Sequence, residues 1–239
     1  MKKIFVAALA LGIILTGSNA KAYMADKAVL ASTTLVENDP TTIIDNYIKA
    51  VGGKANVSKI KNSVLVMEAD FQGNAIVIRG ISDQENGRML QETSVMGNVA
   101  QKTVLANGKG KMSGMGQEQE LTEEMVSVLK AQTYVFPEMH YKDLGYVLEA
   151  QGTEKIDEED AYKLIITAPN GMKTVEYYSV ASGLKLRTSS DATGEISYLD
   201  YTEIEGVKVP TKLAIKNPML PVTIEAKIIS LNFNQVLSD

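Results

Sequence analysis

The chain has 239 residues, with 24 basic and 29 acidic side chains, a net charge of −5, and neither cysteine nor tryptophan. The lack of cysteine excludes disulfide bonds and a lipid anchor on an N-terminal thiol. The acidic balance argues against nucleic acid and against anionic lipid headgroups as partners, because both normally require a basic surface.

Residues 1–22 have the features of a cleaved signal peptide. Lys2 and Lys3 precede an apolar run from Ile4 to Leu15, and small and polar residues lead on to Ala20-Lys21-Ala22. The run is shorter than the ~20 apolar residues that span a bilayer. We therefore predict export to the periplasm, with no membrane span after cleavage. The mature chain of about 217 residues has 21 basic and 29 acidic side chains, a net charge of −8.

A flexible leader is predicted over residues 23–38, which are small, polar and aperiodic. The folded domain is predicted to cover residues 39–239. It starts with a helix, because Asp39 can cap the first turn and Pro40 suits the first helical position. Gly52-Gly53 ends this helix, and its apolar side chains recur at helical spacing: Ile43, Ile44, Tyr47, Ile48 and Val51.

A second helix is predicted from Thr122, whose hydroxyl can cap the freed amides. Glu123 and Glu124 follow at the positive end of the helix dipole. The expected apolar face consists of Met125, Val128 and Leu129.

Most of the remaining chain alternates between apolar and polar side chains, which predicts strands. Two of the expected apolar faces are Leu65, Met67, Ala69 and Phe71, and then Val207, Val209, Leu213 and Ile215. From Val222 the apolar residues alternate as far as Ile228 and then slip by one to Ile229, which predicts a β-bulge in the last strand.

Closely spaced turn signals indicate consecutive antiparallel hairpins rather than crossover helices. These signals are Asn107-Gly108, Asn170-Gly171, Ser182-Gly183, Thr193-Gly194 and Glu205-Gly206. The predicted fold class is α+β: a large, curved antiparallel sheet of about ten strands, with a few helices.

No catalytic, metal or cofactor site is predicted. His140 is the only histidine, so a two-histidine zinc motif cannot form, and we interpret it as a loop histidine beside aromatic side chains. The acidic run Asp157 to Asp160 lacks the alternating ligands and the glycine of a calcium loop, which favours a solvated turn.

Methionine is unusually frequent, at 11 residues, and most of them fall in the first two thirds of the chain. Flexible thioether side chains can line a cavity that accepts variable apolar shapes, or they can simply fill the core beneath a curved sheet. Composition leaves both interpretations open.

Four stretches resemble the outer-membrane lipoprotein-sorting-like domain of Bacteroidota-type bacteria. They are Asp45 to Lys54, Gly152 to Tyr162, Glu176 to Lys185, and Gly206 to Lys212, and the resemblance spans roughly residues 39–233. It implies the fold of the periplasmic lipoprotein carriers, an unclosed and strongly bent antiparallel barrel with helices packed on its concave face. Carriers of that kind shield the acyl chains of lipoproteins between the two membranes.

The resulting hypothesis is a noncatalytic periplasmic carrier or binding protein for lipid or lipoprotein acyl chains in outer-membrane lipoprotein sorting. The expected cavity wall and plug consist of Leu65, Met67, Phe71, Met125 and Leu129. One alternative is an envelope protein-protein interaction module without a ligand, associated with a zinc-peptidase-like partner, since related modules occur beside such domains. Another is a hydrolase of unrecognised type that uses His140.

Overall fold

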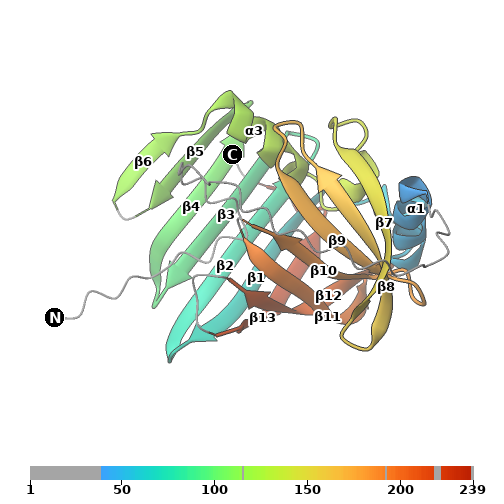
Figure 1. Ribbon diagram of the computed structural model, residues 1–239. Helices are drawn as coiled ribbons and strands as arrows, with labels where there is room; N and C mark the ends of the chain where they lie inside the picture. The colour runs from blue at the N-terminus through green and yellow to red at the C-terminus, as the bar shows by residue number, and fades with distance from the viewer. Residues whose placement is uncertain (1–38, 115, 192, 218–221, 238–239) are drawn as a thin grey trace, which may run out of the picture.

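A computed structural model describes residues 39–237 apart from Met115, Ala192 and residues 218–221. The predicted signal peptide and leader lie outside the described residues. The architecture is one antiparallel sheet of thirteen strands in the order β6-β5-β4-β3-β2-β1-β13-β12-β11-β10-β9-β8-β7. The sheet bends strongly and is not closed, so that β6 and β7 form its two edges (Figure 1).

The helical elements are few and short: α1 (Pro40–Ala50), α2 (Lys54–Val57), α3 (Glu123–Leu129), and the 3-10 turns η1 (Lys130–Thr133) and η2 (Pro137–His140). The strands are β1 (Asn62–Phe71), β2 (Asn74–Asp83), β3 (Arg88–Val95), β4 (Asn98–Ala106), β5 (Lys109–Gly114), β6 (Gln117–Glu120), β7 (Val147–Ile156), β8 (Glu159–Thr167), β9 (Lys173–Ser179), β10 (Lys185–Ser190), β11 (Gly194–Ile204), β12 (Val207–Lys216) and β13 (Ile224–Phe233).

This architecture confirms the predicted α+β half-barrel. The strand number exceeds the expected value of about ten because some strands have no apolar alternation to reveal them. In β6, for example, all four side chains are exposed and polar.

The first helix forms as its sequence predicts. The Asp39 carboxylate accepts a hydrogen bond from the Thr42 amide at 3.2 Å, and Pro40 occupies the first turn. After the helix, Gly52 adopts φ +132°, and a Cβ atom there would lie 2.4 Å from the Gly206 carbonyl oxygen. Glycine therefore allows the end of α1 to approach the β11-β12 turn closely.

The third helix begins at the predicted cap, where the Thr122 hydroxyl accepts a hydrogen bond from the Met125 amide at 3.3 Å. The predicted apolar face is partly wrong, because Val126 is buried with Val128 and Leu129 while Met125 is only half-buried. The physical reason is the packing of α3 against β5. Gly110 leaves space on β5, and a Cβ atom there would lie 3.1 Å from the Val126 side chain.

The predicted bulge in β13 is confirmed. Met67 of β1 pairs with Ile228, whereas the preceding Val66 pairs with Ser230, so Ile229 is the extra residue. Ile229 is 56% exposed, and the residues beyond it return to the original face.

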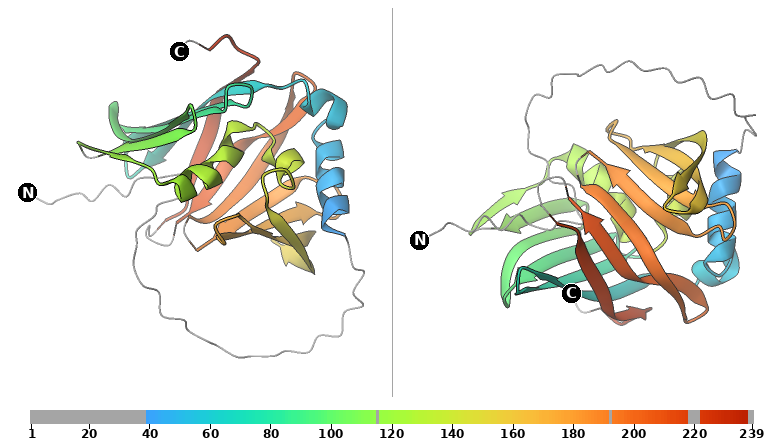
Figure 2. Two further views of the ribbon diagram at one scale, coloured as in Figure 1. Left: turned by 90° about the horizontal axis from the view of Figure 1, so that it is seen from above. Right: turned by 60° about the horizontal axis from the view of Figure 1, so that its bottom comes forward.

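The helices pack on the same face of the sheet that carries Met67, which we call the inner face. Near one edge, α3 contributes Val126 and Leu129 to a cluster with Met89 and Leu105 of β3 and β4. Towards the other edge, α1 packs with strand residues that include Leu164, Val207, Val209 and Phe233. Figure 2 shows the blue α1 at one end of the sheet and the green α3 across its inner side.

Candidate functional site

Between the two helical clusters, the inner face is lined by strand side chains alone. This apolar floor consists of Met67, Ile76, Ile78, Ile196, Leu213, Ile215, Ile224 and Ala226, with the partly buried Leu65, Ala69, Phe71, Val95, Tyr198 and Ile228 around it. Paired residues on neighbouring antiparallel strands share a face, and Met67 pairs with Ile78 on one side and Ile228 on the other. In the described part of the chain, no helix residue belongs to this cluster.

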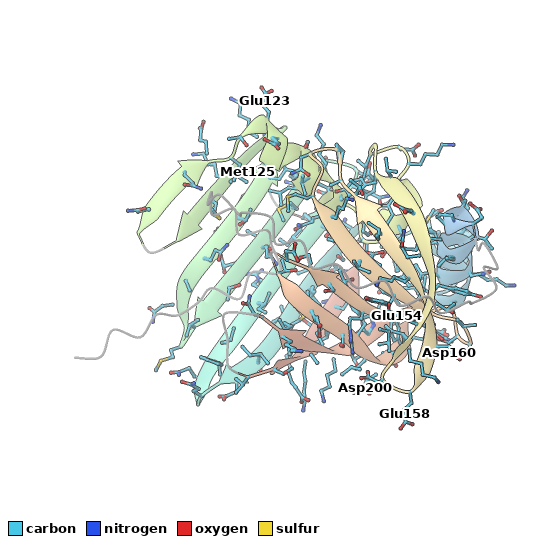
Figure 3. The ribbon with its side chains drawn as sticks, viewed as in Figure 1. Glu123, Met125, Glu154, Glu158, Asp160 and Asp200 are labelled. Atoms are coloured by element: carbon cyan, nitrogen blue, oxygen red, sulfur yellow. The ribbon has the colours of Figure 1, made fainter. Side chains whose placement is uncertain are left out.

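The structure brings together three of the five side chains that the sequence nominates for a cavity. Leu65, Met67 and Phe71 all belong to the apolar floor. Leu129 lies in the separate α3 cluster, and Met125 is half-buried on the same helix without joining that cluster. Figure 3 shows Met125 and Glu123 at the α3 end of the half-barrel.

A charged cluster is buried under α1 and η2, beside the apolar floor. The Lys185 ammonium group contacts the Glu138 carboxylate at 2.5 Å and the Glu176 carboxylate at 2.9 Å, and all three side chains are at most 8% exposed. Tyr141 donates a hydrogen bond to Glu176 at 3.0 Å, and Tyr178 donates to the other oxygen of the same carboxylate. We call these five residues the Lys185 cluster.

Aromatic rings surround the ammonium group of this cluster. Its nitrogen lies 5.4 Å from the ring centre of Tyr178, 5.6 Å from that of Tyr47 and 6.0 Å from that of Tyr198. These distances allow cation-π attraction in a buried site. The second oxygen of Glu138, Oε2, has no hydrogen-bond partner among the described residues. One ammonium group thus forms ion pairs with two carboxylates.

The electrostatics of the cluster favour a protonated lysine and neutral tyrosines. Burial lowers the pKa of Lys185, but Glu138 and Glu176 more than compensate and hold that pKa well above its usual value. Burial, reinforced by nearby carboxylates, raises the pKa values of Tyr47, Tyr141 and Tyr178 well above normal. The cluster therefore keeps its hydrogen-bond donors throughout the neutral range.

This cluster was not predicted from the sequence, although the residue pattern of β9 indicates part of it. Glu176 alternates with Thr174 and Tyr178, which would place a glutamate and a buried tyrosine on the same face of β9. Lys185 and Glu138 could not be paired from the sequence, since 47 residues separate them.

The residues considered for catalysis or metal binding lie in η2 and in the turn between β7 and β8. The His140 ring stacks on Tyr134 with 4.0 Å between ring centres, and partial burial lowers the pKa of this histidine. Asp157 and Glu158 lie in the exposed turn between β7 and β8. Within the described residues, no three histidine, cysteine, aspartate or glutamate side chains are grouped to hold a metal ion.

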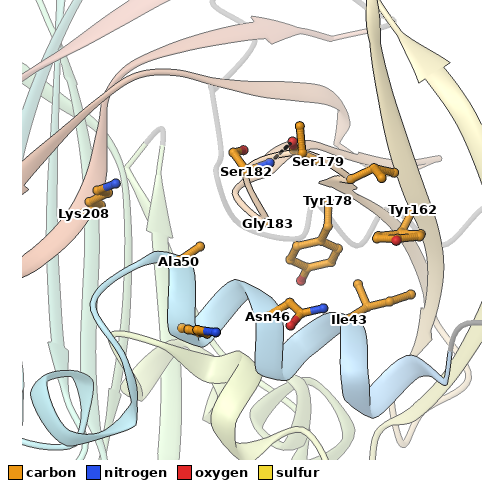
Figure 4. A pocket seen from close by; sticks show the side chains of 12 residues that line it. Ile43, Asn46, Ala50, Tyr162, Tyr178, Ser179, Ser182, Gly183 and Lys208 are labelled. Atoms are coloured by element: carbon orange, nitrogen blue, oxygen red, sulfur yellow. Dashed lines mark hydrogen bonds between the residues drawn. The ribbon is translucent and has the colours of Figure 1, made fainter.

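A surface pocket of about 520 Å³ lies between α1 and the turn that joins β9 to β10. It is lined by Ile43, Asn46, Lys49, Ala50, Tyr162, Tyr178, Ser179, Val180, Ala181, Ser182, Gly183 and Lys208. Figure 4 shows Lys208 and Tyr162 at opposite ends, with the turn on one side and α1 on the other. This pocket is separate from the residues of the apolar floor.

The comparisons with known proteins bear on the fold. No protein-family model matches the chain, and no curated protein matches it. Among solved structures, a LolA superfamily protein from Nitrosomonas europaea has a TM-score of 0.55 at 11% identity, covering 83% of this chain and 94% of that one.

Two further solved structures match over similar lengths. A domain from Vibrio parahaemolyticus, described as an outer membrane lipoprotein-sorting domain, has a TM-score of 0.55 at 14% identity, covering 84% of this chain and 96% of that one. A DUF1329 family protein from Desulfovibrio piger has a TM-score of 0.52 at 15% identity, with coverage of 84% and 96%. The chain therefore has a LolA-like fold, as its sequence motifs predict. The Bacteroidota-type assignment stays a prediction.

Across the described residues, no helix combines the length and apolar character needed to cross a membrane.

Proposed function

We propose that this protein is a noncatalytic binding or carrier protein for an apolar ligand, with lipid or lipoprotein acyl chains as the ligand and the periplasm as its location. The observation that carries the proposal is the apolar floor, a continuous set of strand side chains between two helical clusters. Acyl chains need such a surface because they offer apolar contacts and almost no hydrogen bonds.

The LolA-like fold supports the same proposal. An open, bent sheet can widen without breaking its strand ladders, and such a sheet can accommodate ligands of different width. Two of the matching structures are described as a LolA superfamily protein and an outer membrane lipoprotein-sorting domain. We extend a role in lipoprotein sorting from these proteins to this chain as a hypothesis.

Within the floor, we assign ligand contact first to Leu65 and Phe71, which are only partly buried, and to Met67 between them. Met125 and Leu129 would contact the ligand from the α3 side. An interaction module without a ligand and a hydrolase that uses His140 remain the competing hypotheses, and the stacking of His140 on Tyr134 gives the second no support.

Native mass spectrometry tests the proposal on mature protein purified from the envelope of a host that exports it. We expect adducts of acyl-chain mass that disappear after lipid extraction. A clean apo mass, unchanged after incubation with lipid or lipoprotein, would contradict the proposal and favour the interaction module.

Variants on β1 locate the ligand. Phe71→Asp should abolish the adducts, because a carboxylate on the floor must lose its hydration when an acyl chain binds. Phe71→Leu and Met67→Leu keep the surface apolar and should retain them. Glu68→Lys introduces a charge on the opposite face of the strand, where the side chain is exposed, and should also retain them. Equal capture by all four variants would exclude the floor as the site.

A further inference from the structure

The pocket between α1 and the β9-β10 turn has a chemical character opposite to that of the apolar floor. Its lining residues include Asn46, Ser179 and Ser182, together with two lysines, Lys49 and Lys208. No aspartate or glutamate is among its lining residues. The pocket thus combines positive charge with neutral hydrogen-bonding groups.

The two lysines of the pocket form no close ion pair within the described part of the chain. Two nearby carboxylates accept hydrogen bonds from lining residues, since Ser179 donates to Glu159 and Tyr178 donates to Glu176. Glu203 is the cross-strand partner of Lys208 but is not among the lining residues. The charged groups that line the pocket are therefore both cationic.

The walls are defined by close packing of the backbone. Gly183 adopts φ +74°, and a Cβ atom there would lie 3.1 Å from the Asn46 carbonyl oxygen and 3.2 Å from Ala50 Cβ. The Ser182 amide donates to Ser179 Oγ at 2.8 Å, which fixes the turn above α1 (Figure 4). The Lys208 amide donates to the Val51 carbonyl oxygen at 2.8 Å and ties β12 to the end of the helix.

We propose that this pocket binds a phosphate ester, with the phosphate near Lys49 and Lys208 and the organic body towards Tyr162. A phosphate group with one or two negative charges would balance the positive charges of the two ammonium groups. A volume of about 520 Å³ accommodates a small molecule such as a polyol or sugar phosphate. The tyrosine ring offers a flat apolar face to the body of the ligand.

Phosphate esters reach an exported protein either as soluble metabolites or as phospholipid headgroups, and the two sources require different probes. We would titrate isotope-labelled mature protein with glycerol 3-phosphate and glucose 6-phosphate, following the Ser182 and Gly183 amide signals by NMR. Glycerol and glucose are the matched neutral ligands. Phosphatidylglycerol vesicles, tested by co-sedimentation against phosphatidylcholine vesicles, represent the headgroup source.

We expect saturable shifts with a phosphate ester and none with its neutral analogue. Lys49→Gln combined with Lys208→Gln should weaken binding at least about tenfold, equivalent to ~1.4 kcal/mol. Lys109→Gln removes the same charge from an exposed lysine on β5 and should leave binding unchanged. Both lysines of the pocket are exposed, so the double variant should fold normally, as circular dichroism would verify.

Each outcome decides the proposal. If only phosphatidylglycerol vesicles bind, and the double variant abolishes this, the headgroup is the source of the phosphate ester. Binding of neither soluble ester at about 10 mM, together with no difference between the vesicles, would overturn the proposal. So would binding that the double variant leaves intact. Acyl-chain capture on the apolar floor is measured separately and does not depend on this result.

Discussion

Replacing Lys185 by methionine would leave two carboxylates buried without their shared cation. Methionine has a similar volume, so the change isolates the charge more than the packing. Glu138 and Glu176 are 5% and 7% exposed and lie 2.5 and 2.9 Å from the ammonium nitrogen. Removing one partner of a buried ion pair typically costs ~3–5 kcal/mol. Since both carboxylates lose their partner here, we expect a loss of ~4–5 kcal/mol, a large share of the ~5–15 kcal/mol that stabilises a typical domain.

Glu138→Gln provides the contrasting variant. The amide oxygen can still accept the hydrogen bond from Lys185, and the charge that is removed belongs to a carboxylate whose Oε2 has no partner among the described residues. The remaining pair, Lys185 with Glu176, is balanced in charge. We therefore expect the stability to change by less than ~1 kcal/mol in either direction.

Urea unfolding followed by far-UV circular dichroism measures both changes. For a urea dependence of ~2 kcal/mol per molar, Lys185→Met should lower the unfolding midpoint by about 2 M, and Glu138→Gln by less than ~0.5 M. The reasoning would be refuted if Lys185→Met stayed within ~1 kcal/mol of the unmodified protein, or if Glu138→Gln cost as much as Lys185→Met.

Three further predictions concern pH, a glycine and the bulge. Folding raises the pKa values of Lys185 and Tyr178. Their contributions to stability are therefore complete below pH ~10 and decline above it. A midpoint for urea unfolding that stays constant from pH 8 to pH 11.5 would contradict this prediction. Gly52→Ala should lower the free energy of unfolding by at least ~3 kcal/mol, because its φ is +132° and the new Cβ would lie 2.4 Å from a carbonyl oxygen. Gly53→Ala, with nothing within 4 Å of its Cβ, should lower it by only ~1 kcal/mol. Equal melting temperatures of the two variants would contradict the close approach at Gly52. Ile229→Lys should change stability by less than ~0.5 kcal/mol, because the side chain is 56% exposed. Ile224→Ala should lower stability by ~2–5 kcal/mol, because Ile224 is only 1% exposed. If urea unfolding showed the larger loss for Ile229→Lys, the strand would have a different register.

Local patterns predicted the strands and helix starts well because both depend on residues close together in sequence. The side chains of Leu65, Met67 and Phe71 share one face simply because a strand repeats every two residues. The slip after Ile228 was visible for the same reason, and the ladder confirms it. Asp39 and Thr122 cap their helices with bonds that span three residues.

Choices between equivalent local patterns were less predictable. Met125 and Val126 are both apolar and adjacent, so periodicity alone could not decide which of them the short α3 helix buries. Gly110, on another strand, provides the space that Val126 fills. Strand β6 was not predicted, because its four polar side chains show no alternation. Its position depends on pairing with β5.

The sequence by itself determined the fold class, the inner faces of the main strands and the starts of α1 and α3, because alternation, caps and glycine turns act over a few residues. Only the tertiary structure decided which distant groups meet. It buried Lys185 between carboxylates from η2 and β9, and it joined α1, a β-turn and β12 around one pocket. Burial, pairing of charges and the shape of a pocket are properties of three-dimensional contact, and residue spacing along the chain carries almost no information about them.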